Sequence, residues 1–314
     1  MTLTHLDQLA SLSDPLHLAM GVFDGLHIGH QAVISQAVRH AAQTGGLAGL
    51  LTFDPHPIRV TAPGKAPASL LETLAHKERI ARALGIQVFI PLHFDATLAA
   101  MEAGEFIERL TRAPLRTIAV GEDWRFGHHR NGDVTLLTDA AQHHAFHLEA
   151  LPPVMFEGER ISSTRIRQAI RDGNLNAAAH MLGRPYGVTG NVIPGKQLGR
   201  TLGFPTANIA TGDLQLPPDG VWAVRVTTPD GYLHPGVANL GVRPTLNGSS
   251  RILEVHLFGF SADLYGSNLE VLFASYLRPE MRLPSLDALR AQISQDAQAA
   301  RLALTMPPHF PSLG

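Results

Sequence analysis

The stretch Met20-Gly21-Val22-Phe23-Asp24-Gly25-Leu26-His27-Ile28-Gly29-His30 joins the end of an apolar run to two histidines. A helical pattern over residues 31–40 follows, so the stretch predicts a short strand, a turn that contains glycine and the start of a helix. The first turn of a helix presents unpaired backbone N–H groups and the positive end of the helix dipole, and both attract anions. With that helix in place, His27 and His30 lie on one face beside those N–H groups. The stretch therefore predicts a phosphate-binding loop, with a plain strand-loop-helix turn as the alternative.

The alternation of strand and helix signals continues to about residue 180. Apolar runs that are separated by helical or proline-rich segments lie at 16–23, 48–53, 88–91 and 117–120. This rhythm predicts an α/β domain with a parallel sheet and crossover helices. The loops that follow three of these runs span 24–30, 54–57 and 121–127. Because ligands collect at the carboxyl edge of an open α/β sheet, we expect the three loops to share one crevice.

Beyond residue 186 the sequence changes to runs rich in valine and aromatic residues, separated by Pro and Gly turns. These runs lie at 221–226, 252–258 and 269–273. They predict an antiparallel sheet or barrel. Ser285 then precedes apolar residues at helical spacing, so we expect a capped amphipathic helix that packs on the barrel.

The length of 314 residues is sufficient for two domains of ordinary size. Residues 172–186 predict a short closing helix followed by a Gly-Arg-Pro exit, and we place the domain boundary there. The expected domains are residues 1–182 and 183–314.

Composition narrows the class of function. The chain has 25 Lys and Arg against 27 Asp and Glu, so it lacks the basic field that gathers nucleic acid. It has no cysteine, which excludes disulfides, a thiolate nucleophile and sulfur-ligated zinc. The N-terminus lacks the pattern of a signal peptide, and no uncharged stretch approaches the ~18 apolar residues that span a bilayer. We expect a cytoplasmic monomer or weak homo-oligomer that acts on small molecules, without nucleic-acid or membrane partners.

A second segment, Arg160-Ile-Ser-Ser-Thr-Arg-Ile-Arg-Gln-Ala-Ile-Arg171, places three hydroxyls before a helical pattern. Alone, it predicts an N-capped helix with solvated arginines. Together with the histidine loop it resembles the HxGH nucleotidyltransferases. In that family a His-x-Gly-His loop and an Ile-Ser-Ser-Thr-x-Ile-Arg loop close on a nucleoside triphosphate from opposite sides, and both elements occur here in that order.

A third segment, Gly195-Lys-Gln-Leu-Gly-Arg-Thr-Leu-Gly-Phe-Pro-Thr-Ala-Asn208, resembles the flavokinase motif, in which a glycine-rich loop leads into Pro-Thr-Ala-Asn. With the N-terminal half, it makes the chain resemble the bacterial bifunctional riboflavin kinase and FAD synthetase family over nearly its whole length. Further family-like blocks lie at 52–57, 121–127, 236–245 and 277–280. Trp124 stands where the family usually has phenylalanine. The resemblance implies a Rossmann-like HxGH nucleotidyltransferase domain, then an antiparallel Greek-key β-barrel flavokinase domain with a terminal helix.

For the N-terminal domain the resemblance implies that the phosphate of FMN attacks the α-phosphorus of ATP, which gives FAD and pyrophosphate. His27 and His30 would be catalytic, because charge on the α-phosphate is stabilised by preorganised donors. The implied nucleotide-binding residues are Gly21, Phe23, Asp24, Gly25, Asp123, Arg160, Ser163, Thr164 and Arg167. Asp54 and His56 are assigned to the flavin. The individual roles of these two residues and of Asp123 stay open, and for Asp123 the alternatives are magnesium, a ribose hydroxyl or no ligand.

For the C-terminal domain the resemblance implies phosphorylation of the 5′-hydroxyl of riboflavin by ATP. The implied phosphate-binding residues are Gly195, Lys196, Gly199 and Gly203, with Thr206 and Asn208 as Mg²⁺ ligands. Glu254 matches the catalytic glutamate of the family. Its strand places it on the face opposite Leu253 and Val255, where a carboxylate can accept the hydroxyl proton. Arg278 and Glu280 are assigned to the flavin side of this site.

Three rival interpretations are weaker. A nucleotidyltransferase for another phosphorylated alcohol, with a barrel that only captures substrate, leaves the Pro-Thr-Ala-Asn motif unexplained. A flavin carrier without chemistry leaves the intact catalytic set unexplained. A zinc site at His27 and His30 lacks the carboxylate of a His-Glu-x-x-His pattern and an obvious third ligand.

Overall fold

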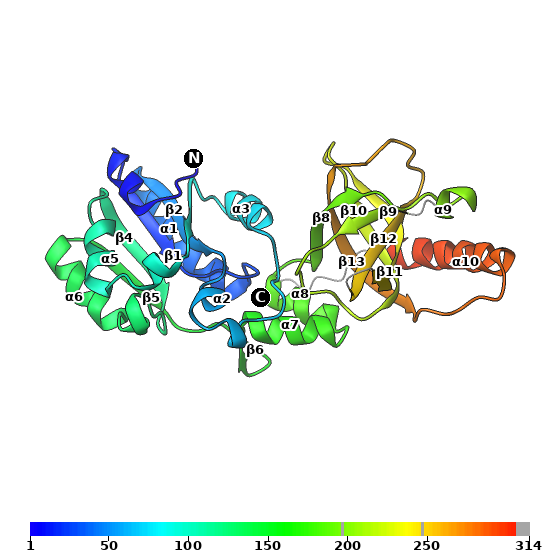
Figure 1. Ribbon diagram of the computed structural model, residues 1–314. Helices are drawn as coiled ribbons and strands as arrows, with labels where there is room; N and C mark the ends of the chain where they lie inside the picture. Colours follow the sequence, from blue (N-terminus) through cyan, green and yellow to red (C-terminus); the bar gives the residue numbers. More distant parts are fainter. Residues whose placement is uncertain (196–197, 246–247, 306–314) are drawn as a thin grey trace. The chain divides into compact units, whose positions relative to one another are not determined.

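The computed structural model describes residues 1–195, 198–245 and 248–305. The chain forms two compact units (Figure 1). One comprises Met1–Ala68 and Thr73–Ser163, and the other comprises Ser69–Glu72 and the described residues from Thr164 onward.

The first unit is built on a parallel sheet with the strand order β3-β2-β1-β4-β5 (Figure 1). Its strands are β1 Leu16–Met20, β2 Leu47–Asp54, β3 Val88–His93, β4 Leu115–Gly121 and β5 His147–Leu151. The predicted parallel sheet is therefore confirmed. Strands β1 and β4 are neighbours, and the chain builds outward from them in opposite directions. Their carboxyl ends thus form the switch point at which ligands bind in open α/β sheets.

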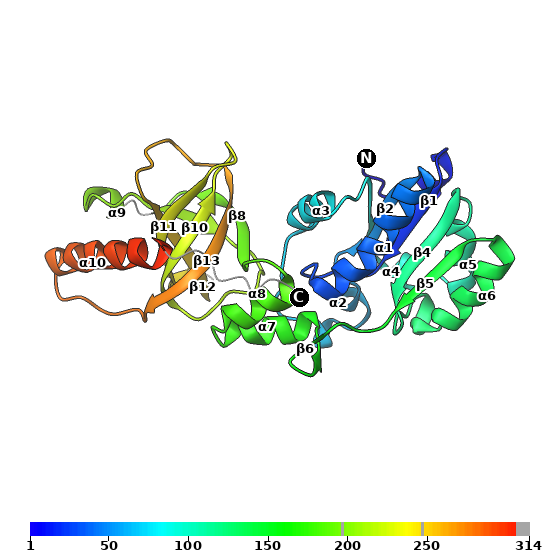
Figure 2. The same ribbon diagram turned by 180° about the vertical axis from the view of Figure 1, so that it is seen from behind.

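Helices cover both faces of this sheet (Figure 2). The elements are η1 Leu6–Ser11, α1 Ile28–Thr44, α2 Pro57–Thr61, η2 Pro63–Lys65, α3 Leu74–Ala83, α4 Ala96–Ala99, α5 Ala103–Leu110, η3 His128–Arg130 and α6 Val134–His144, with a hairpin of β6 Met155–Phe156 and β7 Glu159–Arg160. One core joins α1 and α3 to Ala19 of β1, and the other joins η1, α5 and α6 to Leu18 and Met20. Successive side chains of β1 thus face opposite cores, as strand geometry requires.

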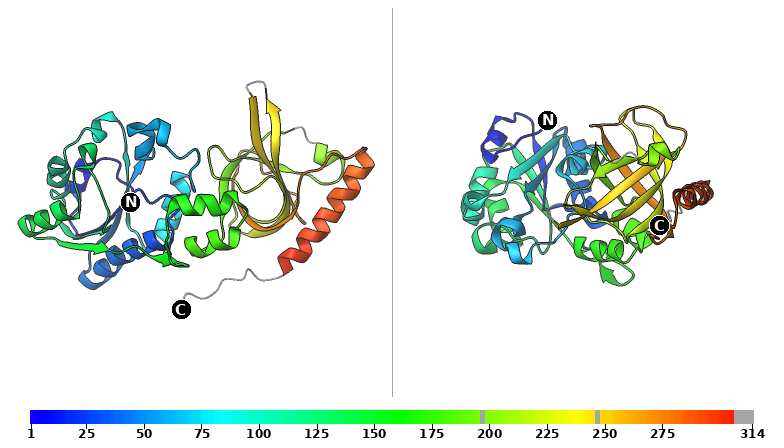
Figure 3. Two further views of the ribbon diagram at one scale, coloured as in Figure 1. Left: turned by 90° about the horizontal axis from the view of Figure 1, so that it is seen from below. Right: turned by 45° about the vertical axis from the view of Figure 1, so that its right-hand side comes forward.

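The second unit contains a closed antiparallel barrel in the order β10-β11-β12-β9-β8-β13 (Figure 3). Its strands are β8 Gly187–Ile193, β9 Ala207–Ala210, β10 Gly220–Thr227, β11 Leu233–Thr245, β12 Gly248–Leu257 and β13 Asn268–Arg278. Its helices are α7 Ser163–Arg171, α8 Leu175–Leu182, α9 Leu198–Thr201 and α10 Leu286–Thr305. Of the two predicted alternatives, sheet or barrel, the structure has the barrel.

The C-terminal helix packs on this barrel as predicted. Ser285 Oγ accepts the backbone N–H of Ala288 at 3.1 Å, which caps α10. Ala297 and Ala300 of the helix share a core cluster with Val221 and Ala223 of β10. Among the helices of the described residues, none has the length and apolar character that crossing a membrane demands.

The second unit also includes a short piece of the N-terminal half. Leu70 donates its N–H to the carbonyl of Asp213 at 3.0 Å, and its own carbonyl accepts the N–H of Gln215 at 2.8 Å. Arg184 Nη2 lies 3.3 Å from the buried carboxylate of Glu72. A chain divided between residues 182 and 183 would separate residues 69–72, α7 and α8 from the barrel, although all three belong to the second unit. The domain boundary at that position stays a prediction.

We expect fragments 1–182 and 183–314 each to fold. Fragment 183–314 should melt at least about 4 °C below a fragment that starts at residue 164, because the shorter fragment lacks α7 and α8. A shift of this size corresponds to about 1 kcal/mol of unfolding free energy in a domain of this length. Thermal melts followed by circular dichroism measure the difference. Non-cooperative melting of both 1–182 and 183–314 would place the boundary elsewhere.

Candidate active sites

The histidine loop lies between β1 and α1, at the switch point of the sheet. His27 is the N-cap of α1, and its Nδ1 accepts the backbone N–H of His30 at 3.2 Å. The two rings stack with centroids 3.5 Å apart and an interplanar angle of 18°. Since Nδ1 of His27 is an acceptor, its N–H is on Nε2, which suits a phosphate oxygen. The predicted strand, turn and helix are confirmed, and both histidines lie at the positive end of α1.

The turn before the helix is tightly wound. The apolar run predicts a strand up to Phe23, but β1 ends at Met20. Beyond it the backbone is no longer extended, because Phe23 has a φ of 52° and Leu26 a φ of 38°. Left-handed conformations cost such residues of order 1–3 kcal/mol. A Cβ on Gly21 would approach Cε1 of Phe23 to 2.9 Å, and one on Gly29 would approach Cε1 of His27 to 3.2 Å. Glycine at these two positions lets the rings pack against the backbone.

Buried polar groups hold this turn from behind. Thr52 Oγ1 and Lys77 Nζ each donate to the carbonyl of Val22 at 2.8 Å. Ser163 Oγ donates to the carbonyl of Asp24 at 2.8 Å. Ser163 of the second motif therefore lies against the histidine loop, as the resemblance predicts. In this structure its hydroxyl contacts the backbone of that loop. Sequence reasoning missed Lys77, for which no motif gives a signal.

Two predicted nucleotide-binding residues, Asp123 and Arg160, lie together. Asp123 follows β4, and its Oδ2 accepts Nη1 of Arg160 at 2.5 Å. This hydrogen bond holds the pKa of Asp123 below its usual value, and the same contact raises the pKa of Arg160. Both side chains are more than half exposed, so this ion pair adds little to stability. Their nucleotide-binding role stays a prediction.

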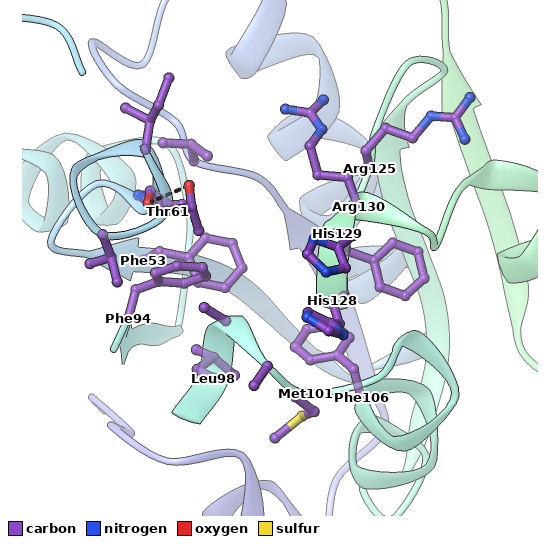
Figure 4. Close-up of a pocket in the computed structure, with 18 of the residues that line it drawn as sticks. Phe53, Thr61, Phe94, Leu98, Met101, Phe106, Arg125, His128, His129 and Arg130 are labelled. Atoms are coloured by element: carbon purple, nitrogen blue, oxygen red, sulfur yellow. Dashed lines mark hydrogen bonds between the residues drawn. The ribbon is translucent and has the colours of Figure 1, made fainter. Parts of the chain in front are cut away.

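A cavity of about 830 Å³ opens at the carboxyl edge of the sheet (Figure 4). His56 of the loop 54–57 and Asp123 of the loop 121–127 both line it, so these two predicted loops share a crevice. From the first segment only Val22, which precedes the loop 24–30, is among the described lining residues, and a crevice shared by all three loops stays a prediction. Asp54 is exposed at the end of β2 and is not among the described lining residues.

Aromatic and apolar side chains make the walls of this cavity. Figure 4 shows Phe53 and Phe94 on one wall and Phe106, His128 and His129 on the other. Trp124 stacks on Phe53 with centroids 6.2 Å apart and an interplanar angle of 16°. Sequence reasoning assigned none of these aromatic residues to a site. Phe53 and Trp124 lie within family-like blocks, whereas Phe94, Phe106, His128 and His129 come from segments that carry no motif. The cavity suits a flat aromatic ligand.

Thr164 and Arg167 belong to the second unit. Arg167 is buried, and its Nη2 donates to Thr164 Oγ1 at 3.3 Å. Their predicted contact with the nucleotide stays a prediction.

In the barrel, strand register assembles a second site. Glu254 of β12 lies opposite Asn208 of β9 on one side and Asn239 of β11 on the other. Its neighbours Leu253 and Val255 are fully buried, so the predicted division of this strand into two faces is confirmed. Thr206, Asn208 and Glu254 line one cavity of about 250 Å³. Three residues that sequence reasoning assigned to one site are therefore brought together.

The glycine-rich loop lies against this cavity. A Cβ on Gly195 would collide with the amide of Asn208, and one on Gly199 would collide with the carbonyl of Phe204. Gly203 has a φ of 88°, and its N–H donates to the carbonyl of Arg200 at 3.2 Å. Lys196 lies outside the described residues. Phosphate binding by this loop stays a prediction.

Arg278 and Glu280 both line the same cavity. Arg278 forms a bidentate pair with the buried Asp296 of α10, with Nε–Oδ1 at 2.7 Å and Nη2–Oδ2 at 2.6 Å. Glu280 Oε1 accepts Nδ2 of Asn239 at 3.1 Å. Sequence reasoning missed Asp296, which lies among exposed polar residues of a helix, and Asn239, which lies within a family-like block.

Comparisons with known proteins agree with this two-site architecture. Residues 10–165 match the family model described as FAD synthetase, and residues 182–304 match the one described as riboflavin kinase. The bifunctional riboflavin kinase/FMN adenylyltransferase of Escherichia coli K12 is 40% identical over 92% of this chain and 94% of its own length. The chain belongs to the bifunctional riboflavin kinase/FMN adenylyltransferase family. The enzyme of the same name from Haemophilus influenzae is 38% identical over 90% of this chain and 92% of its own length.

A solved structure shares the fold of this riboflavin kinase/FMN adenylyltransferase family member. It is titled a macrolide-efflux protein from Streptococcus pneumoniae, with a TM-score of 0.82 and 29% identity, and the match covers 96% of this chain and 98% of that one. The family resemblance and the two-domain fold class expected from sequence are both confirmed. The match of the barrel to riboflavin kinase contradicts the rival in which the barrel only captures substrate.

We expect Asp296→Asn to weaken riboflavin phosphorylation, because the amide cannot hold Arg278 at the cavity with two charged hydrogen bonds. The unfolding free energy of the barrel should fall by about 1.5–3 kcal/mol. Steady-state kinetics with riboflavin and a thermal melt measure both effects. The control Asp287→Asn removes an exposed acid from the first turn of the same helix. It should leave the kinetics unchanged and lower the unfolding free energy by no more than about 0.3–1 kcal/mol, the contribution of a charge at a helix N-terminus. Unchanged kinetics in Asp296→Asn would contradict the positioning role.

Proposed function

We propose that this enzyme converts riboflavin to FMN in the barrel unit and FMN to FAD in the sheet unit, with one ATP consumed at each step. The register that brings Asn208, Glu254 and Asn239 together carries the kinase assignment, and the histidine loop supports the transferase. Cytoplasmic location and a monomeric or weakly associated state are proposed on sequence grounds alone.

In the kinase step the 5′-oxygen of riboflavin attacks the γ-phosphorus of ATP. The bond between that phosphorus and the bridging oxygen breaks, and ADP leaves. Glu254 accepts the hydroxyl proton as the new bond forms, a role that typically contributes 10²–10⁴-fold to rate. The barrel supports this role because Leu253 and Val255 fix the direction of the strand face on which the carboxylate lies.

The donor set of this cavity fits Mg²⁺. The hydroxyl of Thr206 and the amide oxygen of Asn208 are hard oxygen ligands, and Mg²⁺ prefers few of these together with phosphates. When bound, the ion would neutralise charge on the ATP phosphates. Arg278, held by Asp296, lines the same cavity and orients the substrate there.

In the transferase step an oxygen of the FMN phosphate attacks the α-phosphorus of ATP, and pyrophosphate leaves without a covalent enzyme intermediate. Negative charge on the α-phosphate is stabilised by the Nε2–H of His27, by His30 and by the N-terminus of α1. We assign the flavin ring of FMN to the cavity walled by Phe53, Phe94 and Phe106. A flat ring between aromatic walls would be bound by stacking and by burial of apolar surface.

The experiment is incubation of the purified full chain with riboflavin, ATP and Mg²⁺, followed by chromatographic separation of the flavins. FMN and FAD should both form. FAD formed only from supplied FMN would remove the kinase from the proposal, and the absence of both products would remove both activities.

Single substitutions should separate the two activities. His27→Ala should lower FAD formation by about 10²–10³-fold, as removal of one transition-state donor does, and leave FMN formation intact. Glu254→Gln should lower FMN formation by about 10²–10⁴-fold, while FMN supplied directly is still adenylylated. Each variant is the folding control for the other, and equal loss of both activities in either one would contradict the two-site division.

A further inference from the structure

Two histidines and a carboxylate meet in the first unit, at a place that neither reaction uses. His40 lies near the end of α1, and His147 and Glu149 lie on β5. His27 caps the opposite end of α1, so the cluster is about 20 Å from the histidine loop along the helix axis.

The three side chains converge on one point. His40 Nε2 lies 3.1 Å from Glu149 Oε1, and His147 Nε2 lies 3.2 Å from the same oxygen. One ligand atom from each residue falls within 4.8 Å of the other two. Zinc–nitrogen bonds of about 2.0–2.1 Å in tetrahedral geometry separate ligand atoms by about 3.3 Å, close to the two spacings found here.

A buried neighbouring ring holds the ring of His40 in place. His17 stacks on it with centroids 6.0 Å apart and an interplanar angle of 9°. His17 is buried, and its two ring nitrogens bond to Thr117 and Thr44 at 2.9 and 2.7 Å. The buried and hydrogen-bonded ring of His17 therefore keeps one face of the His40 ring in position.

The cluster is open to solvent on one side. The side chain of His147 is 59% exposed, against 20% for His40 and 29% for Glu149. An ion can therefore enter, and water can complete its coordination. Arg39 opposes binding, because its Nη2 lies 3.3 Å from Glu149 Oε1.

We propose that His40, His147 and Glu149 bind a divalent transition metal of the zinc type. Two imidazoles and one carboxylate form a nitrogen and oxygen set that suits this class of ion. Each Nε2–H now donates to Glu149, so metal binding moves the ring proton to Nδ1 and puts the Nε2 lone pair on the ion. The bound ion links α1 to the edge strand β5 and stabilises the folded sheet unit by linkage.

The test uses untagged, chelator-treated full-length protein titrated with Co²⁺ at pH 7.5, with visible d–d absorbance and equilibrium dialysis as readouts. One ion should bind per chain with the spectrum of a low-coordinate site. His147→Gln and Glu149→Gln should each weaken binding at least about 10-fold, since changes that only touch a ligand's partner already cost that much. His143→Gln, which removes an exposed histidine of α6, is the matched control and should bind as the wild type does.

Substitution at Arg39 distinguishes a metal site from a plain ion-pair cluster. Arg39→Gln removes the competing cation and should tighten Co²⁺ binding. Wild-type affinity in His147→Gln and Glu149→Gln would assign the ion to scattered surface histidines and overturn the proposal, as would the absence of bound Co²⁺ in the wild type. Weaker binding in Arg39→Gln would also contradict it.

Discussion

Burial of alternate side chains on the strands is the constraint on which the rest of the structure depends. Leu253 and Val255 have to fill the barrel, so Glu254 between them has to face the cavity. The same alternation on β1 sends Ala19 to one core and Leu18 to the other. Reactive groups are therefore positioned by the packing of their apolar neighbours.

Backbone strain in the histidine loop raises the free energy of the folded chain, and hydrogen bonds from the surrounding structure offset it. Phe23 and Leu26 adopt left-handed conformations so that the chain can turn from β1 into α1 within a few residues. The buried Lys77 and the hydroxyl of Thr52 hold the carbonyl of Val22 at the start of this turn. Preorganisation of this kind matters for phosphoryl chemistry, because donors already in place need no rearrangement as charge develops.

Ion pairs in this protein differ in what they do. Asp296 is buried and fixes Arg278 at the barrel cavity through two short hydrogen bonds, so its loss should be felt in both stability and kinetics. Asp123 and Arg160 are exposed, and their pairing contributes charge complementarity rather than stability. The His40, His147 and Glu149 cluster lies between these extremes, with one face buried against His17 and one open to solvent.

The sequence by itself determined the elements whose signals are local. The loop from Met20 to His30, the two faces of the strand around Glu254 and the capped helix after Ser285 all follow from spacing within one segment. Only the tertiary structure decided the pairing of Asp123 with Arg160, the anchoring of Val22 by Lys77, the aromatic cavity and the transfer of residues 69–72 to the second unit. Each of these joins segments that are far apart in the chain, and periodicity within a segment carries no information on which distant segment will pack against it.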